Sequence, residues 1–394
     1  MKTLLATSSR KAKRCSARAS SMKAAPWLHR FWLALVIAIG AFCAETGQAL
    51  AGYIQTNLVS NIPGLATITD PLLVNPWGMS RSPTSPFWTS NQGTSSATLY
   101  AVTGSTTVSQ VLNVNANGFV GIPTTASGPQ GPTGQVNNTN MNSFQLTPGM
   151  ASTSSRFIFA DLNGTISGWA GGLTSTIRVT TPGAVYTGLA INTAGTRLYA
   201  ADSAGSHVNV FDSSFAPVSL PGAFLDPNLP AGFVPFNVQN IDGKIYVTYA
   251  PAGLAAQRGA TLGQGIVDAF DENGVLLQRV VTGSQLAAPW GIALAPSGFG
   301  AFGGDLLVGN FSLGASEINA FDPVTGAFEG SIPINVGAGN GGAANTLYFN
   351  DGLNGETGGL FGAISAVPDP ATLLLLGTGF AGLAVTTWRR ARRN

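Results

Sequence analysis

The chain has little of the chemistry on which most enzymes and disulfide-bonded exported proteins depend. Of its 394 residues only two are cysteine, Cys15 and Cys43, and only two are histidine. Both cysteines precede residue 52, so the rest of the chain has no thiol for a disulfide or for a metal. His207 is the one histidine after residue 52, and a Ser-His-Asp relay or a His-rich zinc site would have to be built on it. We expect it to be an exposed loop histidine.

Charged residues are also scarce, at 9% of the sequence, and unevenly placed. Eight Lys and Arg precede residue 52 and four follow residue 388, which leaves seven basic against fifteen acidic residues in 52–366 and a net charge of −8 there. An acidic body without a basic stripe repels phosphate backbones, which excludes nucleic-acid binding. The sequence also has no phosphate-binding glycine loop, no dinucleotide fingerprint and no EF-hand loop.

The N-terminus has the features of an export signal. A basic stretch leads into the apolar run 31–44, and the small-residue site Ala49-Leu50-Ala51 follows. This pattern predicts a signal peptide, residues 1–51, that signal peptidase cleaves before Gly52. The alternatives are an uncleaved anchor and a start codon mis-assigned upstream of Met22.

The C-terminus predicts a transmembrane helix. Residues 371–388 carry no charge and lead into four arginines. Eighteen helical residues span about 27 Å, close to the hydrocarbon thickness of a bilayer. The terminal arginines would stay on the cytoplasmic side, in contact with the inner membrane. The alternative, a buried core helix, rarely ends in four arginines.

This C-terminal segment, residues 367–394, resembles the PEP-CTERM sorting signal. The matching elements are Pro368-Asp369-Pro370, the apolar span, and an arginine-rich end that includes Arg389 and Arg390. Family members usually have Glu at the position of Asp369. The resemblance implies that an exosortase-type transpeptidase recognises and removes the tail, in a Gram-negative bacterium that makes exopolysaccharide. It also implies an exported protein, membrane-anchored through its C-terminus and then located at the cell surface or outside the cell.

Residues 52–366 are expected to be all-β. Their apolar runs are short, rich in β-branched and aromatic residues, and regularly interrupted by Gly, Asn, Asp, Ser or Pro, which is typical of strands and turns. A strand that ends in Asn or Asp, or in one case in Tyr249, recurs six times. Units of about 50 residues are typical of propeller blades. The six strands are Phe87–Asn91, Phe157–Asp161, Leu198–Asp202, Ile245–Tyr249, Leu306–Asn310 and Leu347–Asn350.

We therefore predict a single β-propeller of six blades, with a pair of β-sandwiches or a β-helix as the alternative. A second recurring strand precedes most of the six, at 75–79, 186–190, 235–238 and 289–293. The first mature strand, 53–58, is expected to close the ring beside the last blade, which leaves only short edges. The Gly-, Thr- and Asn-rich stretch Asn115–Asn142 is expected to be a surface excursion.

The body also resembles an uncharacterised bacterial exported family that is predicted to form NHL-like six-bladed propellers and often carries a PEP-CTERM tail. The resemblance lies in Asn75–Gly78, in Pro289–Ala293, and in the stretches 304–326 and 345–364. Family members usually have a Gly-Leu-Trp strand before the segment Asn-Thr-Leu-Tyr-Phe. Val336–Gly342 stands at that place here, so we expect the last blade to lack a regular inner strand.

The repeats also suggest a binding site. Asn or Asp residues at the ends of second strands would ring one mouth of the central channel, and aromatic residues that begin the inner strands would open on the same face. A ring of oxygen ligands suits Ca²⁺, and aromatics beside amides suit sugars. Alternatively, the Asn and Asp side chains cap turns and the aromatics pack between blades. The candidates are Trp77, Asn91, Asp161, Tyr186, Asp202, Phe236, Trp290, Asn310, Asn350 and Asp351.

Two functions therefore remain open. The first is a non-catalytic envelope protein that binds exopolysaccharide or another surface component and requires no cofactor. The second is a calcium-dependent, lactonase-like hydrolase, which rests on fold analogy. Asp161 and Asp202 gathered with one Asn around a divalent ion would favour the hydrolase, whereas carboxylates placed singly on separate turns would favour binding.

Overall fold

The computed structural model describes residues 52–112, 118–125, 129–332 and 346–367. The expected signal peptide, the expected transmembrane helix and the sorting residues Pro368, Asp369, Pro370, Arg389 and Arg390 lie outside these ranges. Within the described ranges, no helix has the length and apolar character needed to cross a membrane.

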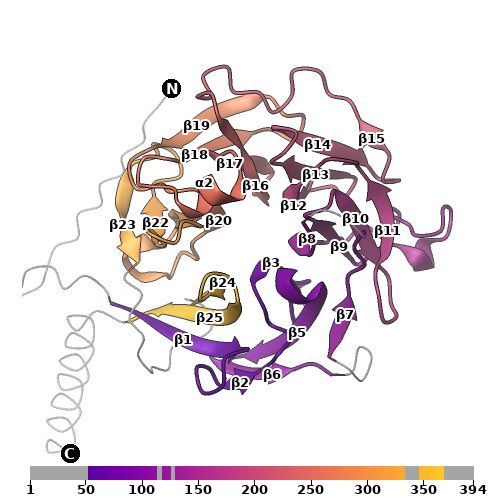
Figure 1. Ribbon diagram of the computed structural model, residues 1–394, viewed down its shortest axis with the longest axis horizontal. Helices are drawn as coiled ribbons and strands as arrows, with labels where there is room; N and C mark the ends of the chain where they lie inside the picture. The colour runs from indigo at the N-terminus through magenta and orange to yellow at the C-terminus, as the bar shows by residue number, and fades with distance from the viewer. Residues whose placement is uncertain (1–51, 113–117, 126–128, 333–345, 368–394) are drawn as a thin grey trace, which may run out of the picture. The chain divides into compact units, whose positions relative to one another are not determined.

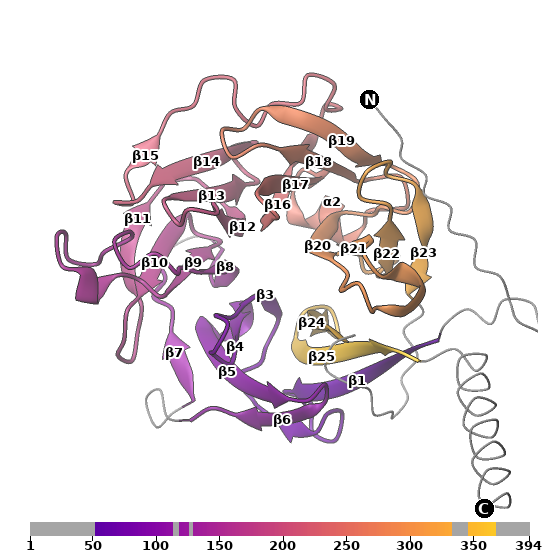
Figure 2. The ribbon, with the colours of Figure 1, turned by 180° about the vertical axis from the view of Figure 1, so that it is seen from behind.

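Six β-sheets stand around a central axis and form a six-bladed propeller (Figures 1 and 2). In blades 1–5 the sheet is antiparallel and its strands follow the chain from the axis outward. Blade 1 is β3 (Pro76–Ser80), β4 (Phe87–Asn91), β5 (Ser96–Thr103) and β6 (Thr107–Gln110), with β7 (Phe119–Gly121) paired to β5. Blade 2 is β8 (Pro132–Asn137), β9 (Phe157–Asp161), β10 (Thr165–Trp169) and β11 (Thr176–Thr180). Blade 3 is β12 (Tyr186–Ile191), β13 (Arg197–Asp202), β14 (His207–Asp212) and β15 (Pro217–Val218).

The second half of the ring repeats this order. Blade 4 is β16 (Phe233–Ile241), β17 (Lys244–Pro251), β18 (Ile266–Phe270) and β19 (Leu276–Thr282). Blade 5 is β20 (Pro289–Leu294), β21 (Leu306–Asn310), β22 (Ile318–Phe321) and β23 (Phe328–Ile332). Each of the six recurring strands found in the sequence lies in a different blade, which confirms the predicted number.

The two ends of the described chain close the ring in blade 6. There β24 (Thr346–Leu353) pairs with β25 (Gly358–Ala366), which pairs with β1 (Tyr53–Ser60), and β2 (Ile68–Thr69) adds to β1. Tyr53 faces Ala366 in the register of β1 and β25, so the predicted closure by the first mature strand is confirmed. Val336–Gly342, where an irregular inner strand was expected, lies outside the described residues.

Glycine recurs at one position of the inner strands because the neighbouring blade presses there. A Cβ on Gly78 of β3 would lie 2.3 Å from the carbonyl oxygen of Thr133, and a Cβ on Gly134 of β8 would lie 2.3 Å from the amide nitrogen of Leu189. Gly188 of β12 meets the inner strand of blade 4 equally closely. Backbone contact of this kind is a common reason for glycine within a strand. The inner strands therefore form a tight ring around the axis.

Apolar layers between successive blades form the core. Between blades 2 and 3, for example, Ile158 and Ile166 pack with Leu189 and Leu198 around the ring of Tyr186. Side chains that alternate along each strand point to the two neighbouring layers, so each blade is covered on both faces. This explains why a short strand such as Phe157–Asp161 is buried along its whole length.

An inner strand lies in a segment that the sequence analysis predicted to be a surface loop. Asn115–Asn142 was predicted to be a surface excursion, but Pro132–Asn137 of β8 runs beside the axis and is almost entirely buried. The strand is polar and small because Gly134 must accommodate the neighbouring backbone and because Gln135 donates to the main chain of blade 1 at Trp88. Its sequence therefore lacks the apolar pattern of a buried strand.

The body also contains a short helix that the sequence analysis did not predict. α2 (Leu254–Arg258) lies in the connection between β17 and β18, beginning after Gly253 and ending at Gly259. The five residues of the helix are all good helix formers. Its last residue, Arg258, reaches the mouth of the channel, as described below.

Candidate ligand-binding site

Four of the candidate Asn and Asp side chains make hydrogen bonds within their own blades. Asp161 accepts hydrogen bonds from the amides of Gly131 and Asn163, both at 3.1 Å. Asp202 accepts from the amide of Val185 at 3.0 Å, as well as from two amides of its own turn. The carboxylates thus join the end of a second strand to the beginning of the inner strand, a role that Asx side chains commonly play in turns.

Asn310 and Asn91 make similar local contacts. The Oδ1 atom of Asn310 accepts from the amide of Ala287, and its Nδ2 donates to the carbonyl oxygens of Gln285 and Ala315. Asn91 is fully buried, and its Nδ2 donates to two hydroxyl groups of β5. Asn310 lines the central cavity, but Asn91, Asp161 and Asp202 are not among the lining residues. The structure therefore brings Asn310 to the cavity lining and leaves these three in contacts of their own blades.

Desolvation affects the acidity of one of these groups. Burial raises the pKa of Asp161 from 3.8 to about 6, although the amides of Asn163 and Gly131 partly offset this by stabilising the charged form. The shift follows from local burial and needs no ligand or second carboxylate.

Two of the predicted aromatic candidates are part of the core. Tyr186 is fully buried, and its hydroxyl donates to Thr181 and accepts from Asn209. Burial raises the pKa of Tyr186 to about 12. Phe236 is also fully buried, with its ring centroid 6.2 Å from that of Trp77 in an edge-on arrangement. Neither residue lines the cavity.

The other two aromatic candidates meet at the channel mouth. The rings of Trp77 and Trp290 lie 5.3 Å apart and nearly perpendicular, and Phe311 lies 5.2 Å from Trp77. The indole N–H of Trp290 donates to the carbonyl oxygen of Thr187 at 2.8 Å. Trp77 is only 7% exposed, and its indole N–H is buried without a hydrogen-bond partner in the described part of the chain.

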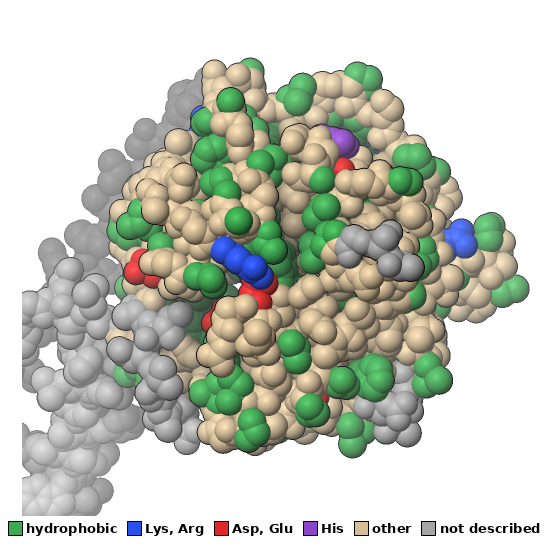
Figure 3. All heavy atoms as spheres, viewed as in Figure 1, with side chains coloured by type: hydrophobic (Ala, Val, Ile, Leu, Met, Phe, Trp, Pro, Cys, Tyr) green, Lys and Arg blue, Asp and Glu red, His purple; other side chains and the backbone are tan. Residues whose placement is uncertain are grey.

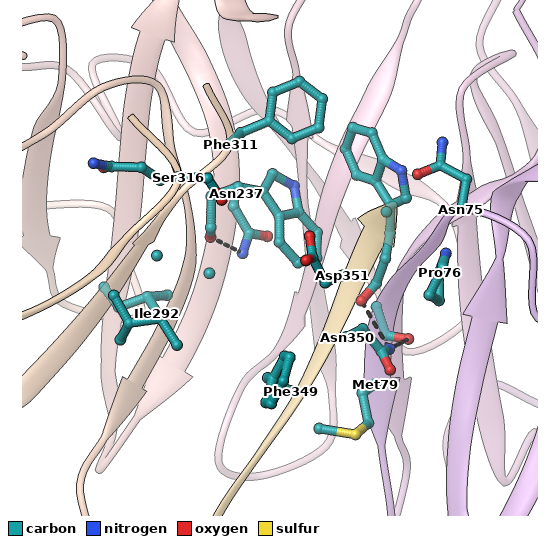
Figure 4. Close-up of a pocket in the computed structure, with 18 of the residues that line it drawn as sticks. Asn75, Pro76, Met79, Asn237, Ile292, Phe311, Ser316, Phe349, Asn350 and Asp351 are labelled. Atoms are coloured by element: carbon teal, nitrogen blue, oxygen red, sulfur yellow. Dashed lines mark hydrogen bonds between the residues drawn. The ribbon is translucent and has the colours of Figure 1, made fainter. Parts of the chain in front are cut away.

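Polar side chains lie beside this aromatic group. Asn350 donates from Nδ2 to the carbonyl oxygen of Trp77 at 3.1 Å, while its Oδ1 is buried and has no partner within the described residues. Asn237 donates to the carbonyl oxygen of Trp290 at 2.7 Å. In Figure 4, Asn350 points from its strand toward Pro76, whereas Asp351 points to the opposite side, toward Asn237. Burial raises the pKa of Asp351.

An ion pair bridges the mouth above these residues. Arg258 of α2 binds Glu356, in the hairpin between β24 and β25, with Nε and Oε1 3.0 Å apart. The carboxylate of Glu356 also accepts from Asn75, which donates in turn to Gln92. Figure 3 shows basic and acidic side chains side by side near the middle of this face. The bridge joins blades 4, 6 and 1, and it holds the Arg258 pKa above its usual value.

The central cavity has a volume of about 540 Å³. We distinguish two parts of its lining. The mouth part contains Trp77, Trp290, Asn350, Asp351 and Glu356, and the blade gap contains Ile292, Leu307, Ile318, Leu347 and Phe349. Aromatic surface beside a few convergent polar groups is the usual composition of a small-ligand site.

The sequence analysis missed several mouth residues, namely Asn75, Asn237, Arg258, Phe311 and Glu356. Asn75 gives a local signal, because its positive φ of 46° is a conformation that Asn tolerates better than most residues. Arg258 and Glu356 are 98 residues apart in the chain, and no pattern in a single sequence pairs them.

Catalytic groups are few around the cavity. His207 is exposed, and its ring nitrogens lie close to Gly205 O and to Asn209 of its own blade. Across the described ranges, no group of three or more His, Cys, Asp or Glu is placed to hold a metal ion. Asp161 and Asp202 lie singly at the ends of β9 and β13, in different blades.

Comparison with known proteins gives two results. Residues 366–393 match the family model of the PEP-CTERM protein-sorting motif. The chain is also 30% identical over 333 residues to "Uncharacterized protein R648" of Acanthamoeba polyphaga mimivirus, with 78% of each chain covered. "Uncharacterized protein L690" of the same virus is 27% identical, with 80% of this chain and 87% of that protein covered.

Solved structures show weaker similarity. A virginiamycin B lyase from Staphylococcus aureus superimposes with a TM-score of 0.46 and 13% identity, covering 80% of this chain and all of that chain. A gluconolactonase from Xanthomonas campestris gives a TM-score of 0.37 at 20% identity, covering 54% of this chain and 73% of that one. The identity to R648 shows that the chain belongs to the family of that mimivirus protein. The C-terminal match shows that it also carries a PEP-CTERM sorting motif, which implies export, anchoring through the C-terminus and processing by an exosortase-type system.

Proposed function

We propose that this protein is a non-catalytic, exosortase-sorted propeller that binds an uncharged segment of exopolysaccharide in the mouth part of its cavity. In this proposal residues 1–51 are a signal peptide removed by signal peptidase, 52–366 are the binding domain, and 367–394 are the sorting segment with its transmembrane helix. The mature protein acts at the cell surface of a Gram-negative bacterium, without a cofactor.

One observation carries the proposal. The indole N–H of Trp77 and the amide oxygen of Asn350 are buried without partners in the described part of the chain, and both residues line the cavity. Leaving a buried polar group unpaired costs about 1–3 kcal/mol. A sugar hydroxyl can accept from an indole N–H and donate to an amide oxygen, so one ligand class satisfies both groups.

The surrounding surface supports the same ligand class. Trp77 and Trp290 provide apolar area for the carbohydrate C–H groups, and Asn237 and Asp351 provide further hydrogen-bonding atoms. A sugar ring needs this combination of an apolar platform and polar partners, because its two faces carry different groups.

Charge supports an uncharged polymer over an acidic one. Glu317, Asp351 and Glu356 line the cavity, whereas no Lys or Arg does so among the described residues. Arg258, at the mouth, is already paired with Glu356. A uronate or phosphate group would therefore meet like charges at close range.

A calorimetric titration tests the proposal. The purified protein is titrated with neutral oligosaccharides from the exopolysaccharide of its host, and wild type is compared with Trp77→Phe. The substitution keeps an aromatic ring but removes the unpaired donor, so we expect about tenfold weaker binding, the equivalent of one hydrogen bond.

Trp169→Phe is the matched control. Trp169 is equally buried at 7% exposure, but its indole N–H donates to Gly172 and it does not line the cavity. We expect this variant to bind as wild type does. No binding by wild type, or equal affinity in the wild type and Trp77→Phe, would contradict the proposal.

A further inference from the structure

We propose that the central cavity also binds one substituted ammonium group, between the carboxylate of Asp351 and the rings of Trp77, Trp290 and Phe311. The group is carried either by an amino sugar of the polymer or by a free quaternary ammonium ion. The proposal goes beyond the proposed function, because it assigns a cation subsite beside the uncharged sugar segment. Three features of the described residues carry it: the carboxylate of Asp351, the aromatic walls, and the charge of the lining.

The first feature is the carboxylate of Asp351. It lines the cavity and points toward Asn237 (Figure 4). The side chain of Asn237 is already engaged, because Nδ2 donates to the carbonyl oxygen of Trp290 and Oδ1 accepts from the amide of Val238. Within the described ranges, no basic side chain forms an ion pair with Asp351. The half-buried carboxylate therefore has a negative charge that no described residue neutralises.

Burial destabilises this charge. Desolvation raises the pKa of Asp351, and the amide of Gly352 only partly offsets the shift. An opposite charge within about 4–6 Å favours the charged form of a carboxyl group. A bound cation therefore replaces the hydration that burial removes, and it does so more completely than a neutral hydroxyl group.

The second feature is the arrangement of the aromatic walls. The planes of Trp77 and Trp290 meet at 80°, and the Phe311 ring meets that of Trp77 at 51° with the centroids 5.2 Å apart. Rings that meet at an angle form adjoining walls and not a flat stack. Trp290 and Phe311 are half-buried, so part of each ring is open to the cavity. The face of an aromatic ring attracts a cation within about 6 Å, and Trp does so most strongly.

The third feature is the charge of the lining. Asp351, Glu317 and Glu356 line the cavity, and among the described residues no Lys or Arg does so. Arg258 at the mouth is paired with Glu356. A cleft lined by one sign of charge focuses the electric field and raises the local concentration of ions of the opposite sign. The cavity therefore favours cations.

The surroundings of Asp351 favour an organic cation over a metal ion. Ca²⁺ takes about six to eight oxygen ligands, and Mg²⁺ requires a near-octahedral shell. Asp351 provides one carboxylate, and across the described ranges no group of three or more His, Cys, Asp or Glu is placed to hold a metal ion. Aromatic faces cannot complete such an oxygen shell, whereas aromatic cages are a common way to bind quaternary ammonium groups.

A titration with tetramethylammonium chloride tests the subsite without any sugar. Binding to the purified protein is followed by tryptophan fluorescence at constant ionic strength. We expect saturable binding to wild type and about tenfold weaker binding to Asp351→Asn, which keeps the shape of the side chain but removes its charge. Phe311→Leu keeps an apolar side chain but removes one aromatic face, so it should weaken binding about threefold or more.

Glu329→Gln is the matched control. It also removes one negative charge, but Glu329 is exposed at the outer strand of blade 5 and does not line the cavity. We expect this variant to bind tetramethylammonium as wild type does. No saturable binding to wild type, or equal affinity in wild type and Asp351→Asn, would overturn the proposal.

A second titration identifies the carrier of the cation and separates this proposal from the proposed function. Glucosamine oligomers with protonated amines are compared with N-acetylated oligomers of the same length. If the polymer is the carrier, the glucosamine oligomer binds more tightly than either the N-acetylated one or tetramethylammonium, and Asp351→Asn abolishes the difference. If a free ion is the ligand, the two oligomers do not differ. Binding of tetramethylammonium without binding of any neutral oligosaccharide would contradict the proposed function alone, and the reverse result would overturn the cation subsite alone.

Discussion

The buried carboxyl group of Asp161 allows the account of the turn caps to be tested quantitatively. Burial raises its pKa from 3.8 to about 6 in the folded protein. Between these two values the unfolded chain has released the proton and the folded chain still holds it. The contribution of Asp161 to the free energy of unfolding therefore falls as pH rises from about 4 to 6 and is constant above that. The shift of about two units corresponds to about 3 kcal/mol.

Asp161→Asn removes this titration and keeps an oxygen that can accept from the amides of Gly131 and Asn163. Urea unfolding of wild type and variant is measured at pH 4 and at pH 7.5. The variant should gain about 3 kcal/mol relative to wild type at the higher pH, and any cost of rearranged hydrogen bonds cancels because it is the same at both values.

Asp322→Asn is the control, because backbone amides of its turn lower the pKa of this exposed carboxyl group. Its contribution is present at neutral pH and lost in acid, so the pH effect has the opposite sign. If Asp161→Asn changes stability equally at both pH values, the carboxyl group is not held protonated by burial and our reasoning is refuted.

Three other predictions concern the turn caps, the mouth and the tail. Asn310→Ala removes three hydrogen bonds and should lower the free energy of unfolding by about 2–3 kcal/mol. The control variant, Asn228→Ala at an exposed position, should leave it unchanged. Equal urea midpoints for the two variants would show that Asn310 does not act as a cap. Arg258→Ala should cost about 1 kcal/mol at low salt and less at 1 M salt; a salt-independent loss would argue against the ion pair. Deletion of 368–394 should release the protein into the medium, as measured by immunoblotting of cells and medium, and unchanged retention would contradict the sorting role.

Much of the fold could be predicted because local chemistry repeats once per blade. In blades 2, 3 and 5 the side chain at the end of the second strand accepts from an amide just before the inner strand of the same blade. An inner strand such as Tyr186–Ile191 packs closely against the inner strand of the next blade. β8 escaped prediction because Gly134 and Gln135 are selected for close backbone contact and hydrogen bonding rather than for apolar burial. Hydrophobic periodicity in a sequence reports apolar burial, but it does not report close backbone contact or hydrogen bonding.

The candidate site was predicted less well, since it depends on contacts between distant parts of the chain. Trp77 and Trp290 were identified because both follow proline at the beginning of an inner strand. The pairing of Arg258 with Glu356 arises from ring closure, which brings together α2 and a hairpin near the end of the body. Asp161 does not line the cavity because its carboxylate accepts hydrogen bonds within its own blade. Tyr186 does not line it because its ring packs in the apolar layer between blades 2 and 3.

The most direct test of the binding claim is a crystal structure of the protein with a neutral oligosaccharide from its host's exopolysaccharide. The account predicts a sugar ring against Trp77, with hydroxyl groups bonded to the indole N–H of Trp77 and to Oδ1 of Asn350. A sugar bound only to the outer strands, or an empty mouth at saturating oligosaccharide, would contradict it.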